Sequence, residues 1–162
     1  MVKPLLGATA VLLVVTIGVY VYRARSDTDR LDAPELLARR ALTAPTVQER
    51  EKAALDLARS GPQALPHLRR VLAESDTPVV RAAVIEGLGG QRDWPSMPQL
   101  LDALEDDDLQ VRGRAGVAVS RILGLEFFFQ ADDPFEQRQP VVGEMRACYE
   151  AMQKSPPPQY KN

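Results

Sequence analysis

A repeated pattern between Thr46 and Leu125 places the strongest limit on what this chain can fold into. Arginines recur 31 residues apart, at Arg50, Arg81 and Arg112. Two apolar sets recur at the same interval: Ala53, Val84 and Ala115, and Leu57, Leu88 and Val119. A period in this range indicates stacked helical repeats, in which each unit buries its apolar face against its neighbours.

Each repeat is expected to contain two helices separated by a break. In the first repeat the break is Ser60-Gly61-Pro62, because glycine favours the conformation that ends a helix and proline cannot continue one. The predicted helices lie at 47–59 and 62–74 in the first repeat, at 78–88 and 97–104 in the second, and within 106–124 in the third.

Both helices of the repeat carry a recognisable motif. The first reads Val80-Arg81-x-x-Val84-x-x-x-Leu88 and Val111-Arg112-x-x-Ala115-x-x-x-Val119, and the second reads Ala64-Leu65-Pro66-x-Leu68 and Ser96-Met97-Pro98-x-Leu100. These residues resemble the HEAT-type repeat, in the short bacterial form often called PBS-lyase-like HEAT. The first repeat departs from it, because Glu49 stands where valine precedes the arginine. The resemblance implies an array that serves as an interaction surface.

The expected fold is therefore all-α, a short α-solenoid of about three HEAT-like helix pairs preceded by one transmembrane helix. Terminal repeats must shield the open ends of such an array, so capping helices are expected on both sides. The expected segments are an N-terminal transmembrane anchor at 1–25, a linker and capping helix at 26–45, the repeats at 46–125, an aromatic turn and capping helix at 126–153, and a disordered tail at 154–162.

The anchor rests on an uncharged stretch of 18 residues, 5–22. As a helix it would be about 27 Å long, close to the thickness of a bilayer's hydrocarbon core. A cleaved signal peptide is the alternative, but Val-Tyr-Arg-Ala-Arg-Ser after the stretch offers no small-x-small cleavage site. Arg23, Arg25 and Arg30 follow it and only Lys3 precedes it, which favours a cytoplasmic soluble domain. The extracytoplasmic orientation remains the alternative.

Composition argues against several function classes. All 22 acidic residues lie after Ser26, together with 17 of the 20 basic residues, so the soluble part carries a net negative charge. A negative net charge disfavours binding to a phosphate backbone. One cysteine, Cys148, and one histidine, His67, provide neither a disulfide nor a cysteine- or histidine-based metal cluster. We find no phosphate-binding loop and no nucleophile beside a base. The sequence predicts no enzyme, cofactor, metal, nucleic acid or small-molecule substrate.

The arginines and the second helices supply the candidate interaction residues. Arg50, Arg81 and Arg112 could grip an acidic ligand, but pairing with aspartates at neighbouring repeat starts, Asp76 and 106–108, is the favoured interpretation. The candidate partner-binding residues are His67, Arg69, Arg70, Gln99 and Asp102.

The C-terminal part begins with the densest aromatic stretch, Phe127-Phe128-Phe129. It is expected to fold over the open face of the third repeat, with an exposed docking patch as the alternative. Asp133-Pro134 then starts a helix, and Pro140 predicts a kink or a restart within it.

The hypothesis from the sequence is a membrane-tethered helical-repeat adaptor that binds a protein partner. An accessory module like the bilin-lyase HEAT proteins and a HEAT-like nucleic-acid binder are the alternatives that the resemblance leaves.

Overall fold

The computed structural model describes residues 33–154 and Tyr160, and every regular element in this part of the chain is helical. The all-α prediction is therefore confirmed for these residues. The predicted anchor at 1–25, the linker before Ala33 and most of the predicted tail lie outside them. No helix among the described residues is both long and apolar enough to cross a bilayer.

The helices follow one another with short connections until the last. They are α2 (Ala33–Thr43), α3 (Val47–Arg59), α4 (Leu65–Glu74), α5 (Pro78–Gly90), α6 (Met97–Asp102), α7 (Leu109–Leu123) and α8 (Phe135–Lys154). Single 3₁₀ turns at Pro62–Ala64 and Trp94–Ser96 lead into α4 and α6, and a third, Ala103–Glu105, follows α6. The sequence predicted continuous helix over 62–74 and 97–104, so the turns Pro62–Ala64 and Ala103–Glu105 replace the ends of predicted helices, whereas Trp94–Ser96 lies between the predicted helices.

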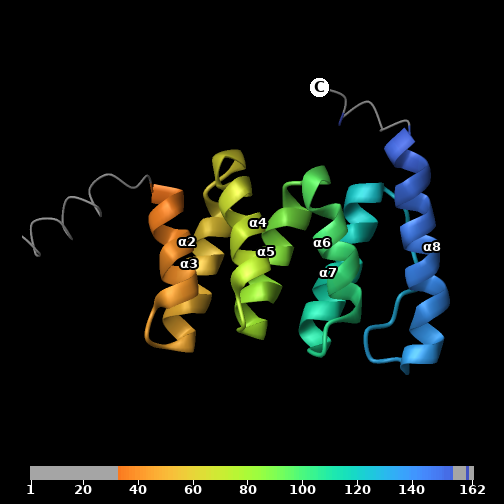
Figure 1. Cartoon of the computed structure of the whole chain (residues 1–162), viewed down its shortest axis with the longest axis horizontal. Coiled ribbons are helices and arrows are strands. Elements are labelled where there is room, and N and C mark those ends of the chain that lie inside the picture. The colour runs from red at the N-terminus through yellow and green to blue at the C-terminus, as the bar shows by residue number, and fades with distance from the viewer. Residues whose placement is uncertain (1–32, 155–159, 161–162) are drawn as a thin grey trace, which may run out of the picture.

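The helices form two rows (Figure 1). In one row α3, α5 and α7 pack side by side. In the other, α2 packs on α3, α4 on α5 and α6 on α7. This is the stacked arrangement expected of an α-solenoid, in which each helix pair contacts only its neighbours.

The core lies between the two rows. All six apolar residues that define the 31-residue period are buried, and Leu57, Leu88 and Val119 are completely inaccessible to solvent. Leu68 and Leu100, at equivalent places in the second helices, are equally inaccessible. The stacking that we inferred from the spacing is therefore confirmed.

Two glycines allow α5 to approach the helix on each side of it. A Cβ atom added at Gly87 would lie 2.6 Å from the Cβ of Ala58 on α3. A Cβ atom added at Gly89 would lie 2.6 Å from the Cβ of Ala118 on α7 and 2.8 Å from its Cα. Opposite faces of the same turn of α5 therefore fit closely against both partners in the row.

Helix ends carry the expected signals in several places. Thr46 and Glu49 form a capping box at the start of α3, and the Asp108 side chain accepts from the backbone of Gln110 at the start of α7. Gly124 ends α7 with a φ of 70°, a left-handed conformation that glycine adopts without strain.

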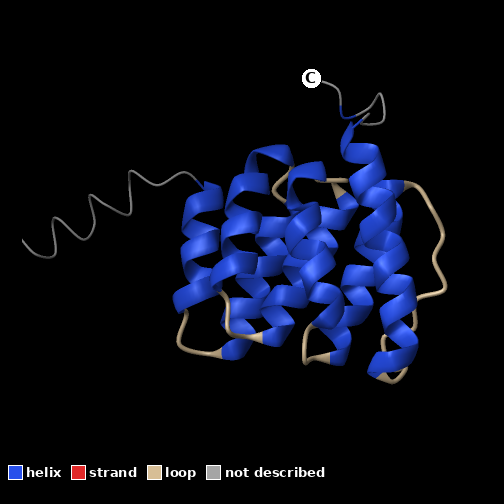
Figure 2. Cartoon of the chain, turned by 45° about the vertical axis from the view of Figure 1, so that its right-hand side comes forward, coloured by secondary structure: helices blue, strands red, loops and turns tan. Residues whose placement is uncertain are grey.

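The last helix, α8, lies beside α6 but runs antiparallel to it, and therefore in the same direction as α7. Arg138 donates to the carbonyl of Leu104, and Arg146, two turns later, donates to the carbonyl of Leu101. The long loop between α7 and α8 returns the chain along the end of the array (Figure 2). α8 continues through Pro140 without the restart that we considered, since its helical assignment is unbroken.

Tyr160 extends the core beyond α8. Its ring centroid lies 4.9 Å from that of Trp94, and its hydroxyl donates to the carbonyl of Ile122 at 3.0 Å. Tyr149 of α8 contacts the same tryptophan, with centroids 5.4 Å apart. The sequence predicted no core residue in the tail, whereas Tyr160 packs against the core.

Candidate functional site

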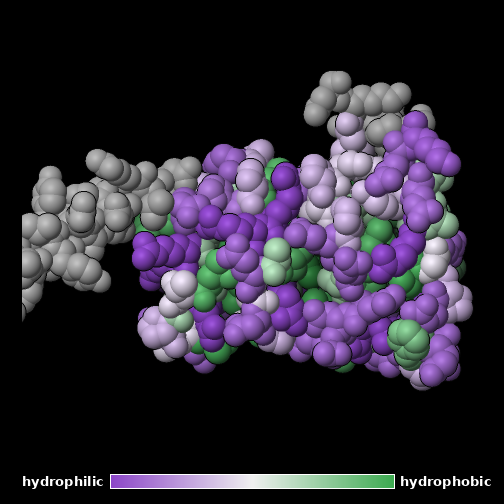
Figure 3. All heavy atoms as spheres, viewed as in Figure 1, coloured by the Kyte–Doolittle hydropathy of each residue, from purple (hydrophilic) through white to green (hydrophobic). Residues whose placement is uncertain are grey.

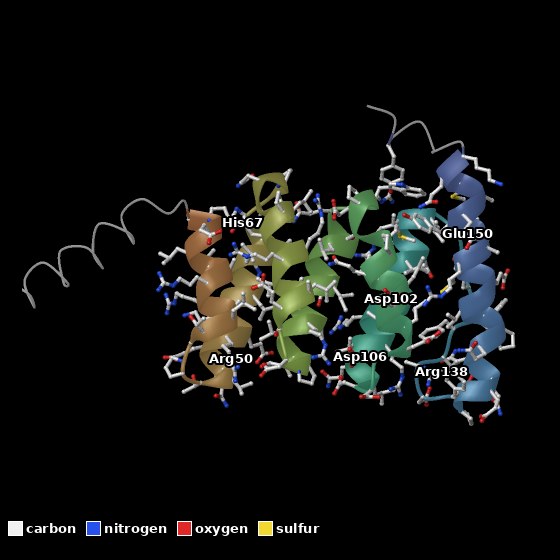
Figure 4. The ribbon with its side chains drawn as sticks, viewed as in Figure 1. Arg50, His67, Asp102, Asp106, Arg138 and Glu150 are labelled. Carbon is white, nitrogen blue, oxygen red and sulfur yellow. The ribbon has the colours of Figure 1, made fainter. Side chains whose placement is uncertain are left out.

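Arg50 and Asp106 lie along the same edge of the array (Figure 4), and the other two repeated arginines, Arg81 and Arg112, both contact Asp106. Arg81 donates from two nitrogens to both carboxylate oxygens of Asp106, at 3.0 and 2.9 Å. Arg50 lies 3.6 Å from Asp76. Each aspartate stands just before the next first helix, so both pairs join successive repeats.

Arg112 has a different set of partners. It donates to the backbone carbonyls of Asp106 and Asp107, at 2.8 and 3.0 Å, and to that of Ala131 in the return loop at 2.9 Å. The third arginine therefore fastens the return loop instead of pairing with an acid. All three arginines contact the chain itself.

Among the candidate partner-binding residues, Arg69 makes the most buried contact. Its guanidinium donates to both carboxylate oxygens of Asp93, at 2.8 and 3.1 Å, and the Asp93 side chain is only 2% exposed. Gln99 donates to the backbone carbonyl of Arg69 at 3.4 Å. This group joins α4 to the turn before α6.

The other candidates join helices in the same way. Arg70 donates to one oxygen of Glu35 on α2 at 3.1 Å, and His67 Nδ1 lies 3.0 Å from the other oxygen. Asp102 accepts from Arg146 of α8 at 3.3 Å. The contacts around His67 hold α2 to α4, and the contact of Asp102 holds α6 to α8.

The structure therefore places the five candidates in internal contacts between successive second helices, and it does not gather them into one site. Their role in binding a partner stays a prediction. On the face drawn in Figure 3, hydrophilic side chains predominate, and hydrophobic ones show mainly in hollows between helices. A binding surface for apolar groups must be sought where large apolar side chains are exposed together.

Such a place lies on α7, where a groove of about 660 Å³ separates this helix from the loop 124–129. Val117, Leu125 and Phe128 line it and are 56%, 40% and 94% exposed. Exposed apolar groups that gather in a hollow are typical of interaction sites. We call the hollow between α7 and 124–129 the α7 groove.

The aromatic stretch forms one wall of the α7 groove, and its side chains differ in exposure. Phe129 packs on α7, where a Cβ atom added at Gly116 would lie 2.6 Å from its ring. Phe127 is also partly buried against the core, whereas Phe128 points into solvent. The covering of the third repeat and the exposed aromatic group, which the sequence left as alternatives, both exist in one stretch.

Two arginines border the α7 groove. Arg92 follows α5 and Arg121 lies on α7. Neither side chain has an ion pair or hydrogen bond within 33–154 or with Tyr160. Glu126 is the acidic residue of the lining. The groove therefore combines exposed apolar side chains with two cations that the described chain leaves unneutralised.

Arg92 holds an unusual backbone conformation, with a φ of 51°. Asp93 donates its N–H to Leu88 and Arg92 donates its N–H to Gly89, the two hydrogen bonds of a Schellman motif. Glycine usually occupies the left-handed position of this motif, and an arginine there costs about 1 kcal/mol.

Replacing Arg92 by glycine should therefore raise the free energy of unfolding by about 0.5–1 kcal/mol, after allowance for the greater freedom of glycine in the unfolded chain. Thermal unfolding of the full chain in detergent, followed by circular dichroism, measures this change. A less stable Arg92→Gly variant would show that the arginine side chain stabilises the turn, contrary to this account.

The paired helices in two rows define an α-solenoid. A family model of HEAT repeats matches residues 34–123, more than half of the chain, and the protein belongs to the HEAT-repeat family. The comparisons with curated proteins and with solved structures gave no match. HEAT repeats in general support interactions between proteins.

Proposed function

We propose that this chain is a membrane-tethered adaptor, which binds a protein partner through its HEAT array and is anchored by residues 5–22. The observation that carries the adaptor role is the α7 groove, where Val117 and Phe128 are exposed on a HEAT array. An anchor would raise the concentration of the partner at the bilayer. We also propose that the repeats are of the short bacterial PBS-lyase-like form, supported by the Val-Arg and Leu-Pro motifs.

Site-specific photo-crosslinking tests the adaptor role. A photoreactive residue would replace exposed Val117 in the α7 groove, exposed Ala73 on α4, or exposed Ala147 on α8 in the full chain. Irradiation of membranes from the native host should give a discrete protein adduct from at least one of these positions. No adduct from any of them would overturn the adaptor role.

Arginines placed in the proposed anchor should release the chain from membranes. Each arginine at the centre of a membrane helix costs about 2.5–3.5 kcal/mol, so Leu12→Arg with Val15→Arg should abolish insertion. The parent chain should stay in the membrane pellet after alkaline extraction, whereas the double variant should move to the supernatant. The matched control is Leu12→Phe with Val15→Phe, which should stay in the pellet.

The side of the membrane on which the array lies can be tested in cells that contain the parent chain. Protease added outside intact cells should leave the array uncut if it faces the cytoplasm, as the basic residues after the anchor favour. A parent chain that alkaline extraction releases would contradict the anchor.

A further inference from the structure

We infer that the α7 groove binds an acidic segment of a protein partner, with a large apolar side chain of that segment seated against Val117 and Phe128. This inference rests on the adaptor role and names the chemistry of the partner. It is carried by the shape of the groove, by its exposed apolar residues and by the two arginines at its border.

The apolar part of the groove suits one or two large side chains. The groove holds about 660 Å³, and Val117, Leu125 and Phe128 leave large fractions of their surface open to it. Gly113 and Gly116 line the groove on α7 and carry no side chain that would fill it, although Phe129 already covers Gly116. Burial of an apolar side chain against these residues is the main source of binding free energy.

The charged part of the groove determines the sign of the charge that the partner must carry. Most described arginines are already engaged, for example Arg69 with Asp93 and Arg81 with Asp106. Arg92 and Arg121 have no such partner in the described ranges. Glu126 is the acid that lines the α7 groove, and Glu86, which lines the neighbouring hollows with Arg121, pairs with Arg114 at 3.3 Å. Acidic side chains on a ligand would neutralise both cations, and complementary charge favours encounter and correct orientation.

Arg121 also connects the α7 groove to the rest of the first-helix row. It lines a small hollow between α5 and α7, of about 50 Å³, and a larger one towards Ala58 on α3, of about 310 Å³. An extended segment that starts in the α7 groove therefore meets further hollows along α5. A run of hollows of this kind favours an extended polypeptide over the flat surface of a bilayer.

The test uses the full chain in nanodiscs of neutral lipid and fluorescent synthetic peptides. The probe peptide carries one tryptophan between aspartates and glutamates. Two matched peptides replace its acids by lysines or its tryptophan by serine. Anisotropy should show binding of the probe alone, and this binding should weaken as salt is raised, because the two arginines are exposed to solvent.

Variants then locate the binding. Arg121→Glu, Arg92→Glu and Val117→Glu should each weaken probe binding at least tenfold, and Phe128→Ser should weaken it severalfold. Arg39→Glu is the matched control, because it makes the same change of charge at an exposed arginine of α2, at the other end of the array. It should leave binding unchanged, and circular dichroism should show that every variant is folded.

Three outcomes would overturn the inference: equal binding of the lysine peptide, no binding of the probe, or equal effects of Arg121→Glu and Arg39→Glu. Lipid is the competing occupant. Additional quenching of Phe128→Trp by brominated anionic lipid in the nanodiscs, relative to the parent chain, would assign the groove to the bilayer and also overturn it. Protein adducts from Ala73 or Ala147 without probe binding would leave the adaptor role intact, whereas no adduct at any position would remove that role itself.

Discussion

Replacing Arg69 by alanine is expected to lower the free energy of unfolding by about 3 kcal/mol. Arg69 donates from two nitrogens to the two carboxylate oxygens of Asp93, whose side chain is 2% exposed. Removal of the arginine leaves a buried carboxylate without its counter-charge, and such a group is far more costly than a lost surface contact. Thermal and denaturant unfolding of the full chain in detergent measure the change.

A charge-neutralising second substitution distinguishes this explanation from simple loss of packing. Asp93→Asn alone should cost less than Arg69→Ala, because the Arg69 side chain is 33% exposed and its charge can be solvated. The double variant should recover part of the stability lost in Arg69→Ala, since no unpaired charge then remains buried. Strict additivity of the two changes would contradict the account.

The second large effect is expected at Gly89. An alanine there brings its Cβ within 2.6 Å of the Cβ and 2.8 Å of the Cα of Ala118, and α5 and α7 must move apart to accept it. Overpacking of this kind in a core typically costs 1–3 kcal/mol, and we expect about 2 kcal/mol. Thermal unfolding of the full chain checks this value.

The adjacent glycine provides the control. A Cβ atom added at Gly90 would meet nothing within 4 Å, and its φ is not in the left-handed region. Gly90→Ala should therefore stabilise the protein by about 0.5 kcal/mol, because alanine favours a helix more than glycine does. Equal effects of the two substitutions would mean that the close approach of α5 to α7 does not limit stability.

Periodicity predicted the array well because each repeat satisfies the same physical requirement. Leu57, Leu88 and Val119 must all be buried for the units to stack. Their 31-residue spacing therefore predicts that the helices that carry them pack side by side in one row. Gly124 likewise predicted the end of α7, because the left-handed conformation that ends a helix favours glycine. The direction of α8 did not follow from any repeat, because only the contacts of Arg138 and Arg146 define it.

The candidate residues show where sequence reasoning was less informative. Arg69 and Asp93 are 24 positions apart, and no spacing rule joins a helix residue to an acid in a later turn. Arg92 carries no signal in the sequence either, because glycine is expected at a left-handed helix end. The Phe127–Phe129 stretch was the visible sign of the α7 groove, but only the structure separates the exposed Phe128 from its packed neighbours.

The most direct test of the central claim, that the α7 groove is where this array binds a protein, combines crosslinking with competition. The full chain with a photoreactive residue at Val117 would be irradiated in native membranes, with the acidic tryptophan peptide or its lysine counterpart present. We expect a discrete protein adduct that the acidic peptide removes and the lysine peptide leaves intact. An adduct at Val117 that persists at saturating acidic peptide would contradict it.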